Sequence, residues 1–210
     1  MEHTRIPEKE IELFKQLKDL KVIFDVGART DTDYSEIWPE SEHHLFEPHP
    51  EFFLELMKKT WGRRKVFPNN FGLGEKNENL GYQTDIQAFI GSAGLSEKAV
   101  FNYILPVKTL DDYVKDNKIT QIDFLKIDTE GHDLKVIIGA KNSLEIIRFI
   151  QYEHWGHDND SQIHHRLQDN FDLEYVGYRN TFCMNKKLVS EEERARLKAY
   201  IVENKLAELA

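Results

Sequence analysis

Two carboxylates and a glycine follow an apolar run in the middle of the chain. Residues 122–127 read Ile-Asp-Phe-Leu-Lys-Ile, and Asp128, Glu130 and Gly131 come directly after them. The run predicts a buried strand, and open α/β sheets bind their ligands where such strands end. Because burying an unpaired carboxylate costs several kcal/mol, two acids here indicate chemistry such as proton transfer rather than packing. A solvated turn between a strand and a helix is the alternative interpretation.

A second pair of segments predicts a nucleoside-binding crossover. Residues 22–26 form a short β-rich run that ends in Gly27 and Ala28, and about twenty residues later Glu47 ends another apolar run. Such a glycine lets a ligand approach the backbone, and such an acid accepts hydrogen bonds from ribose hydroxyls. The loop over residues 27–33 holds one glycine and two acids, which disfavour a pyrophosphate and hence NAD or FAD. S-adenosylmethionine, with a positive sulfonium and no phosphate, suits this loop better.

The chain resembles the FkbM family of methyltransferases in five successive segments. They occur in the family's order at residues 22–28, 46–50, 107–112, 122–131 and 150–153. The block Lys126-Ile-Asp-Thr-Glu-Gly131 is the most specific of them. The resemblance implies a class I, Rossmann-like fold that depends on S-adenosylmethionine. It also implies methyl transfer to an oxygen, often on a sugar or another natural product.

The same resemblance implies roles for individual residues. The candidate cofactor-binding residues are Asp25, Gly27, Ala28, Glu47, Asn70 and Asp128. Asp128 and Glu130 are candidate catalytic residues, and Glu153 is a candidate substrate-binding residue. His154 is a further candidate catalytic residue because of its own position after Glu153, independently of the resemblance. One departure from the family stands in the first motif, which usually continues with Asn and a second Gly. Here Arg29, Thr30 and Asp31 occupy those positions.

Histidines near the predicted fifth strand raise the question of a metal. His154, His157, His164 and His165, together with Asp128 and Glu153, have the donor atoms that transition metals bind. Their spacing matches no closed zinc site, and no H-E-x-x-H motif is present. We therefore do not favour a divalent metal. His154 remains a candidate base because it follows Glu153 at a predicted strand end, although strand alternation points the two side chains to opposite sides.

The remaining pattern predicts an α/β fold in one domain over residues 1–210. With the resemblance, it indicates a mostly parallel seven-stranded sheet flanked by helices and closed by an antiparallel hairpin. The expected terminal helices cover residues of about 8–20 and 190–208, and the hairpin covers residues 173–184 with its turn at Arg179-Asn180. Residues 72–105 are interrupted by glycines and predict two or three short strands with substrate-facing turns.

The amino-acid composition limits the kinds of binding partner and cellular location that we expect for this chain. The net charge of −9 disfavours binding to nucleic acid through phosphate neutralisation. No apolar run approaches 18 residues and the N-terminus has no signal-peptide pattern, so we expect no membrane span and a cytoplasmic location. Cys183 is the single cysteine, which excludes an internal disulfide and favours a reducing compartment.

These features predict an S-adenosylmethionine-dependent methyltransferase that modifies a hydroxyl on a small molecule or sugar. Two other functions stay open: a non-catalytic binding module with an altered cofactor loop, and a metal-dependent hydrolase using Asp128, Glu130 and His154. Sugars, lipids, polyketides and small phenols are all candidate acceptors. The sequence makes no prediction of the oligomeric state.

Overall fold

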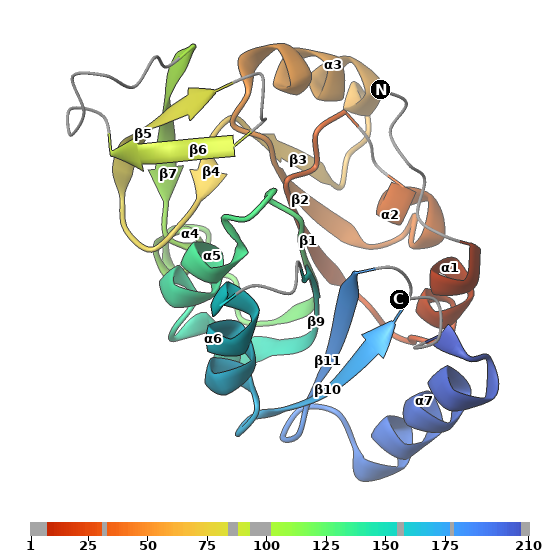
Figure 1. Ribbon diagram of the computed structural model, residues 1–210. Helices are drawn as coiled ribbons and strands as arrows, with labels where there is room; N and C mark the ends of the chain where they lie inside the picture. The colour runs from red at the N-terminus through yellow and green to blue at the C-terminus, as the bar shows by residue number, and fades with distance from the viewer. Residues whose placement is uncertain are drawn as a thin grey trace.

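The computed structural model describes residues 8–30, 33–83, 88–92, 102–154, 158–176 and 179–206. Its main layer is a seven-stranded sheet in the order β10-β11-β9-β8-β1-β2-β3 (Figure 1). These strands span Val22–Val26 (β1), Glu42–Phe46 (β2), Val66–Asn69 (β3), Ile122–Ile127 (β8), Ile147–Glu153 (β9), Phe171–Val176 (β10) and Asn180–Asn185 (β11). Neighbouring strands from β3 to β9 pair in parallel, whereas β11 is antiparallel to both β9 and β10. The predicted Rossmann-like class I architecture is confirmed.

Helices cover both faces of this sheet (Figure 1). They span Glu8–Phe14 (α1), Asp33–Ile37 (α2), Pro50–Thr60 (α3), Leu110–Asp116 (α4), Asp133–Gly139 (α5), Asp158–Leu167 (α6) and Glu191–Glu203 (α7), with a 3₁₀ turn at Ser143–Ile146. Residues of α1, α2 and α7 pack with Ile23 and Phe124, and residues of α4, α5 and α6 pack with Phe24 and Leu125. Because adjacent strand residues face opposite sides, the apolar runs in β1 and β8 fill two separate cores.

A second sheet follows β3 and lies beside α3 and above α4 in Figure 1. It has four strands in the order β4-β7-β5-β6, which span Gly72–Leu73 (β4), Glu78–Gln83 (β5), Ala88–Ser92 (β6) and Tyr103–Lys108 (β7). The prediction of two or three strands is therefore too low. A Cβ atom on Gly139 of α5 would lie 1.9 Å from the Gly74 carbonyl oxygen, so this sheet packs against α5 backbone to backbone.

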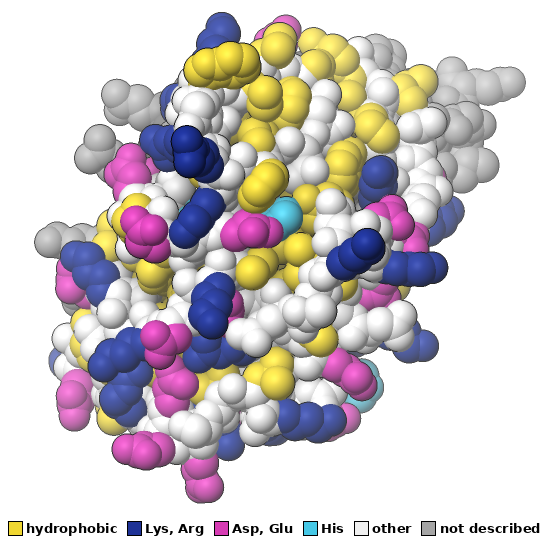
Figure 2. All heavy atoms as spheres, turned by 180° about the vertical axis from the view of Figure 1, so that it is seen from behind, with side chains coloured by type: hydrophobic (Ala, Val, Ile, Leu, Met, Phe, Trp, Pro, Cys, Tyr) yellow, Lys and Arg dark blue, Asp and Glu magenta, His cyan; other side chains and the backbone are white. Residues whose placement is uncertain are grey.

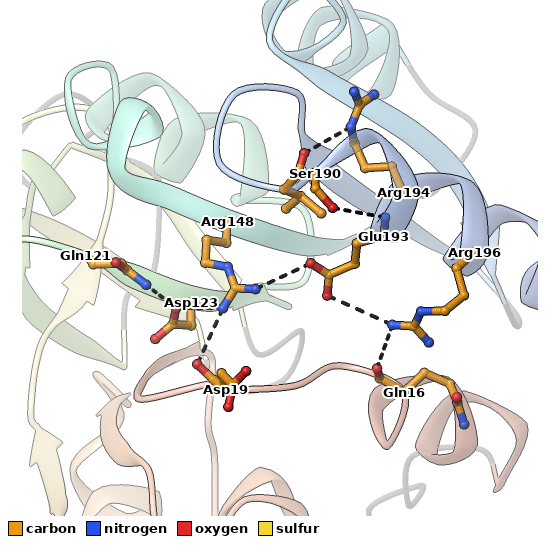
Figure 3. A network of polar contacts seen from close by, with 10 residues as sticks. Gln16, Asp19, Gln121, Asp123, Arg148, Ser190, Glu193, Arg194 and Arg196 are labelled. Atoms are coloured by element: carbon orange, nitrogen blue, oxygen red, sulfur yellow. Dashed lines mark hydrogen bonds and ion pairs between the residues drawn. The ribbon is translucent and has the colours of Figure 1, made fainter.

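A polar network fixes the amino-terminal edge of the main sheet (Figure 3). Asp123, near the start of β8, is fully buried and accepts hydrogen bonds from the backbone N–H groups of Lys21 (2.7 Å) and Val22 (3.0 Å). Arg148 of β9 pairs with Asp123 at 3.1 Å and with Glu193 of α7 at 3.7 Å. These contacts join β1, β8, β9 and the last helix at the edge opposite the strand ends considered below.

Both terminal helices are shorter than predicted. The first ends at Phe14, and Asp19 in the following connection has a left-handed φ of 56° that a helix does not tolerate. The last begins after Ser190, whose side chain accepts from the Glu193 N–H, and it ends at Glu203. Its C-cap N–H donates to the Tyr200 and Val202 carbonyls, which closes the last turn.

Two further expectations need correction. The short helix α2 was not predicted, because residues 27–33 were interpreted as one loop. In the hairpin, Asn180 pairs with Val176 and already belongs to β11, so the predicted turn is displaced toward the N-terminus. Tyr178, predicted to end the first hairpin strand, lies outside the described residues.

The rear face of the molecule is uneven in polarity. Figure 2 shows hydrophobic side chains gathered over its upper part and charged side chains of both signs over its lower part. Exposed large hydrophobic residues include Leu54 of α3, Trp61 directly after α3, Phe67 of β3 and Ile104 of β7. Among the described residues, no helix is both long and apolar enough to cross a membrane.

Candidate active site

The turn after β1 is packed against the end of β8. Gly27 has a φ of +85°, and the N–H groups of Gly27 and Ala28 donate to the Phe46 carbonyl at 3.0 and 3.1 Å. A Cβ atom on Gly27 would lie 1.8 Å from the backbone oxygen of Asp128. Glycine is therefore required here by the close approach of two strand ends as well as by its backbone conformation.

Glu47 is held in place at the end of β2. Its carboxylate accepts hydrogen bonds from the backbone N–H of Arg29 at 2.9 Å and of His49 at 2.7 Å. The side chain is buried, and this burial raises its pKa to about 7, although the two N–H donors act in the opposite direction. Glu47 thus lies in a fixed orientation beside the glycine turn, as the crossover pattern predicts.

A pocket connects these elements at the carboxyl edge of the sheet. Its empty space is about 680 Å³, part of which is open to solvent. Its lining residues are Val26, Gly27, Arg29, Phe46, Glu47, Pro48, Phe52, Gly72, Leu73, Tyr82, Asp128, Thr129 and Glu130. Gly27, Glu47, Asp128 and Glu130 of the predicted site residues are therefore brought together around one space.

A buried lysine connects two of the predicted acids. The Lys126 Nζ atom lies 3.4 Å from Asp25 Oδ1 and 3.2 Å from Asp128 Oδ2. Burial opposes the charge on Lys126, but Asp128 and Asp25 outweigh this effect and raise the pKa of the lysine. Asp25 does not line the pocket, and its side chain is only 5% exposed. Its visible role is to neutralise Lys126 beneath the pocket, whereas Asp128 reaches the pocket wall.

The other carboxylates at this edge disfavour one another's charge. Burial, followed by repulsion from Asp128, raises the pKa of Glu130. The same two causes raise the pKa of Asp133 to about 6, and burial with repulsion from Asp128, Glu130 and Asp133 raises that of Glu153 to about 8. Arg179 lies close enough to lower the pKa values of Glu130 and Glu153. This crowding provides carboxyl groups that exchange protons near neutral pH.

Besides Asp25, four predicted site residues do not line the pocket: Ala28, Asn70, Glu153 and His154. His154 Nδ1 lies 3.2 Å from the Thr181 hydroxyl, and its ring packs edge-on against Tyr175. The Asn70 amide donates to the carbonyls of Glu47 and Pro48 at 3.0 and 3.1 Å, so it supports the backbone after β2. Ala28 is buried with Leu45 and Leu56.

Metal binding finds no support in the described part of the chain. No group of three or more His, Cys, Asp or Glu side chains there is arranged to hold a metal ion. His164 and His165 are exposed on α6, and His157 lies outside the described residues.

Comparison with known sequences identifies the family. The profile of the methyltransferase FkbM domain matches residues 25–179, which include the end of β1, all of β8 and β9, and every candidate site residue. The chain belongs to the FkbM methyltransferase family. A curated relative, the hexuronic acid methyltransferase AglP of Haloferax volcanii, is 25% identical over 144 residues. That alignment covers 67% of this chain and 59% of the relative.

Solved structures share the fold. The FkbM methyltransferase of Methylobacillus flagellatus superposes with a TM-score of 0.55 at 13% identity, over 79% of this chain and 43% of that one. An rRNA methylase of Streptococcus thermophilus superposes with a TM-score of 0.53 at 10% identity, over 88% of this chain and 99% of that one. Fibrillarin of Aeropyrum pernix was solved with natively bound S-adenosyl-L-methionine. It superposes with a TM-score of 0.50 at 13% identity, over 83% of this chain and 73% of that one. This FkbM domain thus spans about half the length of its solved family member.

Sequence reasoning did not find four residues of the FkbM site. Arg29 was noted only as a departure from the family motif, and Lys126 only as part of a strand. Phe52 and Tyr82 line the pocket from α3 and β5, yet an aromatic residue on a helix or in an irregular region carries no ligand signal of its own. Lys126 was detectable in principle, because a lysine inside a buried strand requires a nearby acid.

Proposed function

We propose that this FkbM domain is an S-adenosylmethionine-dependent methyltransferase that methylates a hydroxyl oxygen of a sugar or another small molecule. The observation that carries the proposal is the single pocket lined by Gly27, Glu47 and Asp128. Three strand ends contribute to it, as expected for a ligand at the switch point of an open α/β sheet.

The residues present fit S-adenosylmethionine. Glu47, oriented by two backbone N–H groups, would accept the hydrogen bonds of the ribose hydroxyls. The pocket also presents the carboxylates of Asp128 and Glu130, which favour a cation such as a sulfonium. When bound, this cofactor supplies the activated methyl group. The protein's part is then to align the acceptor oxygen and to remove its proton.

Among the candidate bases, Glu130 fits best. It lines the pocket, and burial and the charge of Asp128 raise its pKa, which makes it a stronger proton acceptor than an ordinary carboxylate. Asp128 pairs with Lys126 at 3.2 Å, so we assign it to orienting the ligands. Glu153 would bind the acceptor beside them. His154, engaged with Thr181 and Tyr175, is the less favoured base.

A carbohydrate is the preferred acceptor class. The relative from Haloferax volcanii is named for a hexuronic acid, and carboxylates such as Glu130 and Glu153 are suited to accept hydrogen bonds from sugar hydroxyls. RNA is the competing acceptor, because an rRNA methylase shares the fold. The net charge of −9 opposes that alternative. We also retain a cytoplasmic location as a prediction.

Calorimetry of the purified protein with S-adenosylmethionine and S-adenosylhomocysteine, with and without EDTA, tests the proposal. Binding that is unaffected by EDTA supports the methyltransferase. Absence of binding to a folded protein would favour a non-catalytic module in which residues 29–33 no longer hold cofactor. A hydrolytic activity that EDTA abolishes would favour the metal-dependent hydrolase. Methyl transfer to free uronic acids and hexoses, compared with an RNA oligonucleotide, then separates the acceptor classes.

A further inference from the structure

Arg29 is the basic residue of a pocket that is otherwise acidic. Three carboxylates, those of Glu47, Asp128 and Glu130, are among the lining residues, and within the described part of the chain no lining residue other than Arg29 carries a positive charge. A pocket of this composition repels any anion unless a cation compensates locally. Arg29 provides that compensation, since it also lowers the pKa values of Glu47 and Glu130.

The Arg29 side chain is positioned without being neutralised. Its Cζ atom lies over the Phe52 ring, 5.0 Å from the ring centre, a cation–π contact that holds the guanidinium beside α3. Its backbone N–H donates to Glu47, which fixes the start of the side chain. No described carboxylate lies within ion-pair distance of the guanidinium, whereas Lys126 below it pairs with two. The donors of a half-buried guanidinium therefore remain available inside the pocket.

The backbone at Arg29 makes this choice of residue costly. Its φ of 52° lies in the left-handed region, which is unfavourable for a residue with a Cβ atom and which Asn or Gly occupies more easily. The family usually has Asn at this point of the motif. An arginine here thus works against local stability, and a ligand contact explains its presence.

We propose that the Arg29 guanidinium binds a carboxylate of a ligand within this pocket. The fork of N–H donors matches a carboxylate in bidentate geometry. The inference rests on the proposed function, which offers two sources of that group. One is the amino-acid end of S-adenosylmethionine, and the other is the carboxylate of a uronic acid acceptor.

The test compares wild type with Arg29→Asn, which removes the charge and suits a left-handed backbone. Calorimetry measures binding of S-adenosylhomocysteine and of 5′-methylthioadenosine, which lacks the amino-acid part. Glucuronate and glucose are then titrated with S-adenosylhomocysteine present. Lys108→Gln is the matched control, because Lys108 also lies over an aromatic ring, 4.7 Å from the centre of Phe71, but does not line the pocket.

A cofactor carboxylate at Arg29 predicts that Arg29→Asn weakens S-adenosylhomocysteine binding by about 10- to 100-fold and leaves 5′-methylthioadenosine unchanged. An acceptor carboxylate predicts the same loss for glucuronate alone. In both cases the melting temperature stays equal or rises. Equal weakening of both nucleosides, or no loss for any ligand, would overturn the inference. If wild type binds neither nucleoside, the proposed function fails first and this inference with it.

Discussion

Carboxylates lie at both ends of strand β8, but their surroundings differ. Near the amino end, Asp123 is fully buried and is matched by two backbone N–H groups and by Arg148. Beyond the carboxyl end, Asp128 is 37% exposed in its side chain and adjoins Glu130 and Glu153, whose pKa values rise in part because of its charge. The charge of Asp123 is thus matched by hydrogen-bond donors of the chain, whereas the carboxylates beyond the carboxyl end repel one another.

This contrast separates acids that hold the fold from acids that handle a ligand. A buried carboxylate with enough donors stabilises the folded state and is silent near neutral pH. Carboxylates that raise one another's pKa cost stability, and such groups cluster where proton transfer or cation binding needs them. The two ends of β8 therefore make opposite predictions for substitutions that remove the same charge.

The largest expected effect is on catalysis at the carboxyl end. Glu130→Gln should lower methyl transfer by about 10²- to 10⁴-fold, the usual contribution of a general base. Because Glu130 is an exposed residue whose carboxyl group is only partly desolvated beside Asp128, the melting temperature and the affinity for S-adenosylhomocysteine should stay close to wild type. Single-turnover methyl transfer with saturating cofactor is the measurement.

Two companion variants decide between Glu130 and the other candidate bases. Asp128→Asn and His154→Gln should each reduce the rate less than Glu130→Gln does. A larger loss in either variant would move the base to that residue. Unfolding of Asp128→Asn, with full activity in the surviving folded fraction, would make that carboxylate structural instead.

At the amino end, removal of the charge should affect only stability. Asp123→Asn is expected to lower the free energy of unfolding by about 2–3 kcal/mol, because hydrogen bonds from two N–H groups and an arginine lose their charged acceptor. Urea unfolding measures this loss, and specific activity per folded molecule should remain unchanged. A drop in cofactor affinity in this variant would show that the two edges of the sheet are coupled.

A substitution at Glu47, in the predicted cofactor-binding part of the site, should change the affinity for the cofactor. Glu47→Ala is expected to weaken S-adenosylmethionine binding by about 1–3 kcal/mol, the range for hydrogen bonds to a charged group. Isothermal titration gives the value, with the melting temperature as a control, because Glu47 also accepts from the N–H groups of Arg29 and His49. An unchanged dissociation constant in a folded variant would reject the ribose assignment.

Short sequence motifs predicted which residues lie at the strand ends of the site, but they did not predict the contacts that require those residues. The sequence pattern predicts that a glycine at position 27 lets a ligand approach the backbone. The structure instead brings the Asp128 carbonyl to within 1.8 Å of a Cβ atom at that position, so any side chain would displace β1 from β8. Such a contact between segments about 100 residues apart leaves no periodic trace in a sequence.

The region between β3 and α4 was the hardest to predict. Its strands are short and pair out of chain order, as β4-β7-β5-β6, so local pattern indicates strands without their partners. Tyr82 reaches the pocket from this sheet. By contrast, β1, β8 and β9 were predicted closely, because strands buried on both faces must be continuous apolar runs.

The smallest expected effect is a pH-dependent gain in stability at the carboxyl end. In the folded protein, burial and neighbouring acids raise the pKa of Glu153 to about 8, above the ordinary carboxyl value. The folded state therefore holds this proton more tightly, and wild type loses stability as the pH rises from about 4.5 through about 8. Glu153→Gln removes the loss. Its melting temperature should match wild type near pH 5 and exceed it by about 2–4 °C at pH 9, or about 1 kcal/mol, since solvent screens part of the repulsion at a half-buried side chain. Thermal melts of wild type and Glu153→Gln between pH 5 and pH 9 measure the difference in melting temperature. Glu55→Gln, which changes an exposed residue of α3, is the control. A shift of equal size at every pH would mean that packing, rather than repulsion among these carboxylates, distinguishes the two ends of β8.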